Sequence, residues 1–509
     1  MAQLLTVPTM NTDLLNIIFG IKIRQARTES HLSLSEFATA CDLSPSYITE
    51  IEKGRKYPKP DKIIKMAEVL GKSYDELAST KMEANLTSLE TMLASHLLQE
   101  FPFDFFGLEI NSLVTLFTRA PKRASALART IIEIGQQYDL KGEHFLRAAL
   151  RAYQEIHDSY FETLEEEAQK FMQQHQLETE FPLTPLTLQN IISQEFGYEL
   201  DTAQLATHPA LSSYRSVYIE GKKPKLLLNA ALRASQLKFL LARELGYQYL
   251  KLEERANTSA PDKVNSFQQV LNDFKASYFA GALLMPQNNI VTDMRQFFQL
   301  KAWQPSYLLE LLGKYDVTPE MLLYRFSELA PKFFDLKPHF IRFNNAEGDY
   351  QLIKQLNLNK LLLPSGTMLD EHHCRRWLGV RLLRDLNASK NQADFNETPL
   401  VGIQNSQFLA SSEQRLTFGF ARPLALTPHI GSSVTIGLQV TPTLKETVRF
   451  LDDPAIPTWI INETCERCSL NWGECKERAA EATLYHANQR QAEREAALNE
   501  LVIRLQSQG

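Results

Sequence analysis

Residues 33–60 read SLSEFATACDLSPSYITEIEKGRKYPKP and contain the signals of two short helices joined by a tight turn. Ser33 and Glu36 form a capping box, which begins the first helix. Ser44 caps the second helix, a proline follows it at the first helical position, and Gly54 ends the helix. Because two helices in this arrangement let the second enter the major groove of DNA, the segment predicts a helix-turn-helix.

Polar and basic side chains gather at this second helix, within a predicted DNA-binding domain at residues 13–80. Residues 53–65 carry six basic residues and one aspartate. Such cations hold DNA phosphates, while polar side chains contact base edges. The predicted DNA-binding residues are Ser44, Pro45, Ser46, Tyr47, Thr49, Glu50, Lys53, Arg55, Lys56 and Lys59.

The same segment has the pattern S-x-x-x-I-x-x-I-E-x-G-x-x-x-P, formed by Ser44, Ile48, Ile51, Glu52, Gly54 and Pro58. It resembles the Cro/C1 (XRE) helix-turn-helix family of transcriptional regulators. The resemblance implies sequence-specific binding to double-stranded DNA. A homodimer on a palindromic operator follows from reading two half-sites about one DNA turn apart. The alternative is a helical bundle that binds only other proteins.

Composition indicates a protein of several domains. The 509 residues suffice for about three domains, and a hydrophobic content of 44% supports packed cores. Because the net charge is −6, DNA binding has to come from a local basic patch. The sequence has no run of about 18 apolar residues, which a membrane helix requires, and no recognisable leader. We therefore expect a cytoplasmic protein without membrane contact.

The rest of the chain divides into helical and mixed parts. Residues 85–180 predict a helical linker or dimerisation region. Within it, an apolar stripe from Phe145 to Met172 corresponds to a helix of about seven turns, either buried in its own domain or forming a dimer. Residues 181–330 predict a mainly helical domain. Residues 331–480 contain short strand-like runs and predict an α+β sensor domain with a largely antiparallel sheet. Residues 481–509 predict a C-terminal helix.

Two stretches in the middle of the chain, QLKFLLARELGYQYL at 236–250 and LNDFKASYFAGALLMP at 271–286, resemble the ImmA/IrrE family. Its zinc peptidases use H-E-x-x-H, in which two histidines hold the metal and glutamate is the base. Here the zinc-binding positions are Arg243, Tyr247 and Asp273, and Glu244 alone keeps its identity. Because arginine is a fixed cation, we predict a degenerate motif without peptidase activity. We expect Glu244 to neutralise Arg243.

Three of the five cysteines, Cys465, Cys468 and Cys475, fall within eleven residues. Their spacing suits a zinc knuckle, which needs a fourth ligand. We predict that Cys374 supplies it, with the two histidines before it as substitutes, and that the zinc is structural. An iron–sulfur cluster and unligated thiols are the alternatives.

The order of these features resembles the short-chain fatty acyl-CoA regulator (ScfR) family. A C-x-x-W motif lies at Cys374–Trp377, and the cysteine cluster ends with Arg478-Ala479, matching the family's R-A. The resemblance implies a switch that senses short acyl-CoA and controls genes of carbon metabolism. The family's G-x-P-F-F-F-x-R-x-D-x-A-G-N motif reads KPHFIRFNNAEGDY here, which keeps Arg342 and lacks the aspartate.

Such a ligand needs cations for its phosphates and an apolar slot for its acyl chain. The predicted ligand-binding residues are Arg342, Lys354, Arg381, Arg384 and Arg422. Two other functions are open at this point. One is a phage- or antitoxin-type regulator controlled by a protein partner, and the other is a metallopeptidase.

Overall fold

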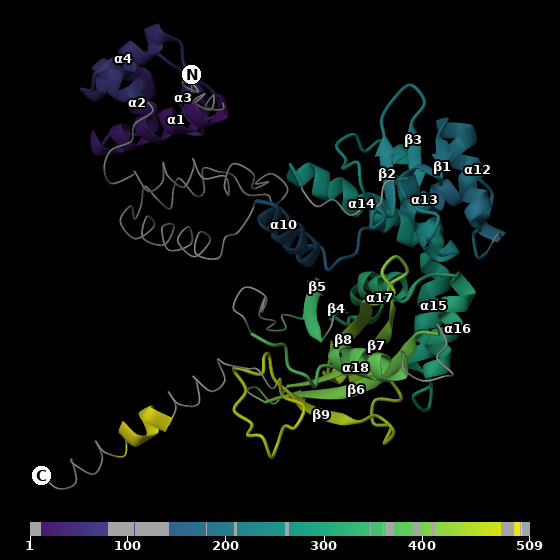
Figure 1. The fold of residues 1–509 in the computed structure, drawn as a ribbon. Helices are drawn as coiled ribbons and strands as arrows, with labels where there is room; N and C mark the ends of the chain where they lie inside the picture. Colours follow the sequence, from purple (N-terminus) through teal and green to yellow (C-terminus); the bar gives the residue numbers. More distant parts are fainter. Residues whose placement is uncertain are drawn as a thin grey trace, which may run out of the picture. The chain divides into compact units, whose positions relative to one another are not determined.

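The computed structural model describes residues 12–79, 106, 142–179, 181–207, 211–259, 264–346, 348–359, 361, 371–390, 398–409, 411, 413–479, 493–498 and 500. The chain forms two compact units, residues 1–149 and 150–509 (Figure 1). Most of the predicted linker lies outside the described residues. So does most of the predicted C-terminal helix, in which residues 493–498 are helical. Within the described part of the chain, no helix is long and apolar enough to span a membrane.

Residues 12–79 form the predicted bundle of short helices: α1 (Thr12–Glu29), α2 (Leu34–Ala40), α3 (Pro45–Glu52), α4 (Pro60–Leu70) and α5 (Tyr74–Ala78). The capping box of α2 is present, since Ser33 and Glu36 exchange side-chain and backbone hydrogen bonds. Phe37, Ile48 and Ile63 are fully buried in the core of the bundle. The prediction of a helical N-terminal domain is therefore confirmed.

The apolar stripe predicted as one helix is two helices, α10 (Gly142–Ile156) and α11 (Glu162–Gln174). Asp158 and Ser159 between them have φ angles of 47° and 58°, left-handed values that end a helix. Phe171 of α11 is fully buried in the core of the second unit. The prediction of one continuous helix is wrong, and α11 belongs to a packed domain.

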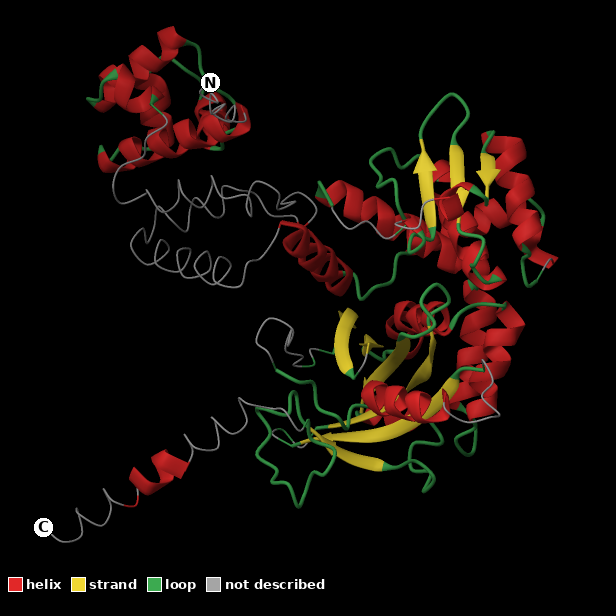
Figure 2. Ribbon diagram, in the orientation of Figure 1, coloured by secondary structure: helices red, strands yellow, loops and turns green. Residues whose placement is uncertain are grey.

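The next part of the second unit combines helices with a small sheet (Figure 2). Its elements are η2 (Leu177–Thr179), α12 (Pro185–Phe196), β1 (Glu199–Asp201), η3 (Gln204–Thr207), β2 (Ser216–Ile219), β3 (Lys225–Leu228), α13 (Ala234–Tyr249) and α14 (Phe267–Leu284). The strands have the order β1-β3-β2. The mainly helical prediction for this region missed the sheet, whose strands have only three or four residues each.

Three helices lead into a six-stranded sheet: α15 (Gln287–Phe298), α16 (Pro305–Tyr315) and α17 (Pro319–Phe334). The sheet contains β4 (Pro338–Ala346), β5 (Asp349–Asn357), β6 (Leu400–Phe408), β7 (Gln414–Pro423), β8 (Gly431–Gln439) and β9 (Thr458–Ile461), with α18 (Leu378–Lys390) and α19 (Pro442–Thr447) in the connections. The strand order is β5-β4-β8-β7-β6-β9, antiparallel except for the β6–β9 pair. The predicted α+β domain with a largely antiparallel sheet is confirmed.

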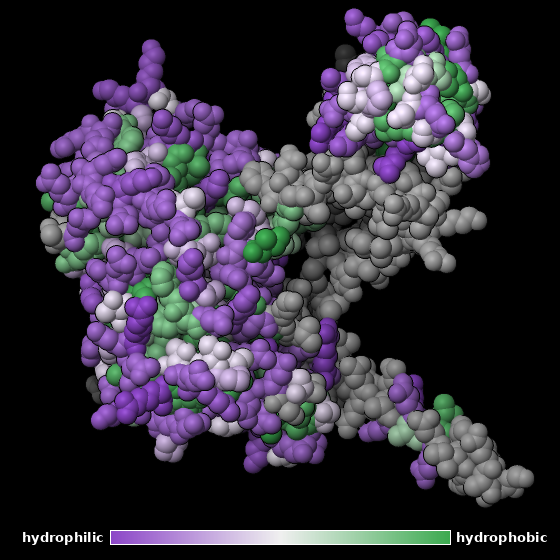
Figure 3. Space-filling model, turned by 180° about the vertical axis from the view of Figure 1, so that it is seen from behind, coloured by the Kyte–Doolittle hydropathy of each residue, from purple (hydrophilic) through white to green (hydrophobic). Residues whose placement is uncertain are grey.

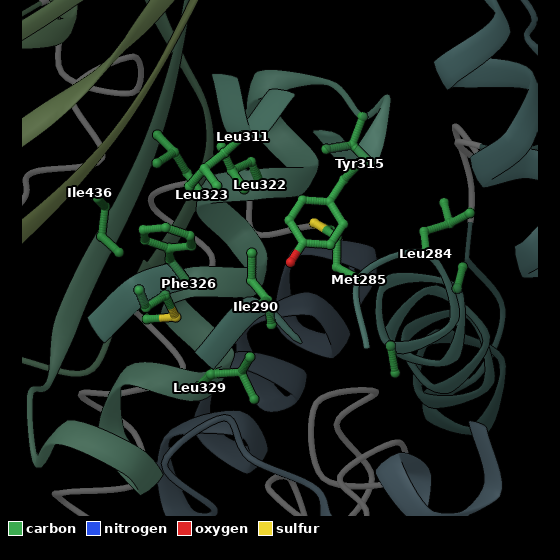
Figure 4. Close-up of a cluster of buried hydrophobic side chains, with 14 of the residues drawn as sticks. Leu284, Met285, Ile290, Leu311, Tyr315, Leu322, Leu323, Phe326, Leu329 and Ile436 are labelled. Carbon is green, nitrogen blue, oxygen red and sulfur yellow. The ribbon is translucent and has the colours of Figure 1, made fainter. Parts of the chain in front are cut away.

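The two faces of this sheet meet different helices. Phe340, Phe418 and Ile436 share one hydrophobic core with α17, whereas Ile341 and Phe343 pack with α18. The first core is continuous from α11 to the sheet, so the regions predicted as separate domains on either side of residue 330 share it. Figure 4 shows side chains from α14, α15, α16, α17 and β8 within it. On the face drawn in Figure 3, hydrophilic residues cover most of the described surface of the second unit.

Helices α13 and α14 pack closely at Gly246, which gives a test of the fold. A Cβ at this position would lie 3.1 Å from the carbonyl oxygen of Ala276 and 3.1 Å from Cδ1 of Phe279. We expect Gly246→Ala to lower the free energy of unfolding by about 1–3 kcal/mol, because the helices have to separate. Urea denaturation measures the change. Gly313→Ala in α16 is the control, since a Cβ there meets nothing within 4 Å. Equal stability of the two variants would contradict the packing.

Candidate functional site

Helix α3 presents the polar surface that the sequence predicts. Ser44 accepts a hydrogen bond from the backbone N–H of Tyr47 at 3.2 Å, and Pro45 is the first helical residue. Ile48 and Ile51 are fully buried on the inner side. On the outer side, Ser46 is exposed and Thr49 and Glu50 are partly exposed. Within its own unit, the predicted base-contacting face is therefore open to solvent.

A buried ion pair that the sequence analysis missed fixes the end of α3. The guanidinium of Arg27 contacts both carboxylate oxygens of Glu52, at 2.6 and 3.0 Å, and donates to the carbonyl of Leu32 at 2.8 Å. The hydrogen bonds that Arg27 donates to the carboxylate of Glu52 raise the pKa of Arg27. Because Arg27 lies on α1, no local spacing could have indicated this contact. It holds the recognition helix firmly against the bundle.

Basic residues follow α3 on the surface. Arg55, Lys56 and Lys59 are exposed, and Lys53 is partly exposed. The ammonium groups of Lys56 and Lys62 lie 5.7 and 4.7 Å from the ring centroid of Tyr47. The prediction did not include Lys62, because it comes from α4 and only the folded chain places it beside α3. The arrangement offers cations next to a polar helix face, as phosphate and base contacts require.

In the IrrE-like region the charges pair differently from the prediction. Nη2 of Arg243 contacts the carboxylate of Asp273, and Nη1 of Arg243 donates to the carbonyl of Ser259 at 3.0 Å. Tyr247 donates to the same carboxylate at 3.0 Å. Glu244 instead binds Arg255. The expectation that Glu244 neutralises Arg243 is therefore wrong.

Arg255, which pairs with Glu244, lies outside the motif, so the motif does not indicate this contact. Its guanidinium contacts both oxygens of Glu244, at 2.5 and 2.8 Å, and lies 3.7 Å from the ring centroid of Tyr218 and 4.1 Å from that of Tyr247. Tyr198 donates a hydrogen bond to Glu244 at 2.8 Å. Burial raises the pKa of both Tyr198 and Tyr247, so these phenols stay protonated. Two arginines and two carboxylates thus balance each other at the predicted degenerate motif.

The predicted cysteines are drawn together from distant parts of the chain. The backbone N–H of Cys374 donates to the carbonyl of Glu463 at 3.2 Å, and that of Cys465 donates to the carbonyl of His372 at 2.8 Å. Cys374, Cys465, Cys468 and Cys475 are all buried and free of disulfides. Burial raises the pKa of Cys374 to about 12, and the neighbouring Cys465 and Cys468 add to the increase.

These cysteines are not arranged as a metal-ligand set. Among the residues described, no three His, Cys, Asp or Glu side chains form a group that could hold a metal ion. Burial also raises the pKa values of Cys465 and Cys475. The zinc site stays a prediction from the sequence.

Basic side chains from both parts of the second unit surround the carboxylate of Glu320 in α17. Nη1 of Arg342 lies 2.8 Å from Oε2 of Glu320, and Nζ of Lys354 lies 3.6 Å from Oε1. The cation cluster, as we call this group, consists of Arg215, Arg233, Arg342, Lys354 and Arg422. Three of its members were predicted ligand-binding residues. Arg215 and Arg233 were missed because they belong to the IrrE-like part of the sequence.

The charges of this cluster shift the pKa values of its members. Burial lowers the pKa of Arg422, and the charges of Arg233, Arg342 and Arg215 contribute, so that it falls to about 10. Burial by itself would raise the pKa of Glu320, but the neighbouring cations lower it to about 2. A group of this kind attracts anions.

The other two predicted ligand-binding residues, Arg381 and Arg384, belong to α18, on the opposite face of the sheet. Nη1 of Arg381 donates to Gln404 at 2.8 Å, and its guanidinium lies 4.4 Å from the ring centroid of Trp459. Arg384 is exposed. The structure therefore brings Arg342, Lys354 and Arg422 together and separates them from these two.

The paired charges of the IrrE-like region predict a large cost for removing Arg255. In Arg255→Met, Glu244 would remain buried without its cation, and we expect a loss of about 3–5 kcal/mol in unfolding free energy. Glu244→Gln in the same chain should restore most of this loss, because it removes the buried charge. Urea denaturation of the single and double variants measures both effects. Lys225→Met, which breaks an exposed pair with Glu199, should leave the midpoint unchanged. A double variant as unstable as Arg255→Met would contradict this account.

Comparisons with known proteins identify two regions of the chain. Residues 23–77 match the helix-turn-helix family, and residues 200–327 match the IrrE N-terminal-like domain family. The control protein C.BamHI of Bacillus amyloliquefaciens is 38% identical over 61 residues, which are 12% of this chain and 75% of that protein. A solved Mycobacterium tuberculosis transcriptional regulator aligns with a TM-score of 0.45 and 18% identity, over 65% of this chain and 92% of that one. The chain therefore belongs to the helix-turn-helix family of DNA-binding regulators, and it joins this domain to an IrrE-like domain.

Proposed function

We propose that this protein is a sequence-specific transcriptional regulator whose affinity for DNA is controlled by an anionic small molecule bound at the cation cluster. The main support for DNA binding is the exposed polar face of α3, which is flanked by the exposed residues Arg55, Lys56 and Lys59. Polar side chains in this position reach base edges in the major groove, and the cations hold phosphates. The relationship to a control protein supports the regulatory role.

We also propose that the protein binds a palindromic operator as a homodimer. A single head of this type contacts one half-site, so binding two half-sites about one DNA turn apart requires two copies of the chain. A twofold-symmetric dimer then places the same residues of α3 in both half-sites.

The cation cluster supports the second half of the proposal. Phosphate groups are bound by guanidinium groups that can donate several hydrogen bonds at once. Three of the five cluster residues lie on strands β4, β5 and β7 of one sheet, which holds them in fixed positions. We propose a short-chain acyl-CoA as the effector, since its phosphates suit this cluster and the resemblance to the ScfR family implies the same class of ligand. A peptidase function has less support, because Arg255 and Tyr198 occupy the carboxylate of Glu244.

DNA binding can be tested on a fragment from the protein's own promoter by fluorescence anisotropy. Lys56→Gln should weaken binding to all sequences and reduce the salt dependence by about one phosphate contact. Glu50→Gln should instead change the preference at one base pair, by about 1–3 kcal/mol, because a carboxylate accepts a hydrogen bond from cytosine. Lys301→Gln, an exposed lysine in the second unit, is the control. If Lys56→Gln and Glu50→Gln both bind DNA like Lys301→Gln, α3 is not the helix that contacts the bases.

Ligand control can be tested by thermal shift with coenzyme A and its acetyl, propionyl and butyryl esters. One ester should stabilise the protein and change its affinity for the promoter. Arg422→Gln should weaken that ligand about tenfold or more, because it removes a charged donor. Arg384→Gln should bind as well as the wild type, since Arg384 belongs to the helix on the other face of the sheet. Equal losses in the two variants, or no response to any ester, would refute this half of the proposal.

A further inference from the structure

We propose that the carboxylate of Glu320 occupies the cation cluster when no ligand is bound, and that a bound anion displaces it. The effect of this displacement passes through Lys354 and Tyr324 to Gln154 on α10. The inference rests on the proposed function, because it describes how the ligand site is coupled to the rest of the chain. The boundary between the two compact units falls within α10, between residues 149 and 150. A signal that reaches α10 therefore reaches the segment through which the chain continues from the DNA-binding unit.

Lys354 makes two contacts at once. Its ammonium lies 3.6 Å from Oε1 of Glu320 and 3.8 Å from the ring centroid of Tyr324. Glu320 and Tyr324 are one turn apart on α17, so both contacts lie on the same side of that helix. The side chain of Lys354 is 43% exposed, and it can move into solvent or toward a ligand without disturbing the core.

Tyr324 connects this lysine to α10. Its hydroxyl accepts a hydrogen bond from Nε2 of Gln154 at 2.9 Å. Gln154 is 4% exposed, so this amide has little access to water as an alternative partner. The ring of Tyr324 also packs edge-on against Phe340 of β4, at a centroid distance of 5.3 Å. The hydroxyl is therefore held in place while the cation above the ring is free to leave.

The direction of the effect follows from the charges. An anion entering the cluster competes with Glu320 for Arg342 and Lys354. When Lys354 turns toward the anion, it leaves the face of the tyrosine ring, where a cation is attracted by the π electrons. Without the cation, the phenol oxygen carries more electron density and becomes a better acceptor for Gln154. Anion binding thus strengthens the hydrogen bond to α10 and holds this helix more firmly.

Hydrogen–deuterium exchange of the full chain, followed at residues 150–156, tests the inference without a ligand. Glu320→Gln releases Lys354 from its carboxylate and should slow exchange there by up to about threefold, which is less than the effect of one whole hydrogen bond because the existing bond is only strengthened. Lys354→Met removes the cation directly and should give the same result. In a Tyr324→Phe background, neither substitution should change exchange. Glu310→Gln, at an exposed carboxylate on α16, is the matched control and should have no effect.

The outcomes separate the two proposals. Saturating coenzyme A should slow exchange at residues 150–156 in the wild type and leave it unchanged in Tyr324→Phe. If neither coenzyme A nor its acetyl, propionyl and butyryl esters bind, the proposed ligand is wrong, and the variants still decide the coupling. If Glu320→Gln and Lys354→Met leave exchange unchanged, the coupling through Tyr324 is wrong. It is also wrong if they change exchange equally when residue 324 is phenylalanine, and both results are independent of whether the ligand binds.

Discussion

The buried ion pair between Arg325 and Glu165 fixes helix α17, on which the organisation of the second unit depends. The guanidinium is fully buried and contacts both carboxylate oxygens, at 2.6 and 2.8 Å, while Tyr278 donates to the same carboxylate at 2.6 Å. The contacts join α11, α14 and α17. Because an unpaired buried charge is strongly unfavourable, the three helices have to stay together. Helix α17 in turn packs on the sheet and presents Glu320 to the cation cluster.

In the IrrE-like region, charged side chains of the chain itself balance one another. In the related peptidases, a divalent cation balances the charges at the centre of the site. Here Arg243 and Arg255 supply two positive charges to Asp273 and Glu244. Each of the two carboxylates, of which Glu244 is buried and Asp273 is partly exposed, therefore has a guanidinium partner. This part of the chain also contributes Arg215 and Arg233 to the neighbouring cation cluster.

Local signals in the sequence predict the DNA-binding head well. Capping boxes, a proline at a helix start and a basic segment act over a few residues, and the structure has each of them where the sequence places it. The antiparallel sheet is also predictable, because alternating short apolar runs separated by turn residues have few other solutions. The failures have a different origin. The break at Asp158 and Ser159 depends on left-handed backbone conformations that the apolar stripe does not reveal.

The sequence alone does not predict contacts between distant segments. The partner of Glu244 is Arg255, in the loop after α13, and no motif spacing includes it. The cation cluster combines residues more than 200 positions apart, such as Arg215 and Arg422. Basic residues are common on surfaces, so only the folded chain separates those that converge on Glu320 from those on α18, such as Arg381. The site is therefore a property of the tertiary fold.

Photocrosslinking can show whether α3 contacts the bases of duplex DNA. A photoreactive amino acid at position 46, on the exposed face of α3, should crosslink to bases of a DNA fragment that the protein selects from a random library. The same amino acid at position 75, in the first turn of α5, should not. Base crosslinks from position 46 alone would agree with the account. Crosslinks from position 75 but not from position 46, or selected DNA that crosslinks from neither, would contradict it.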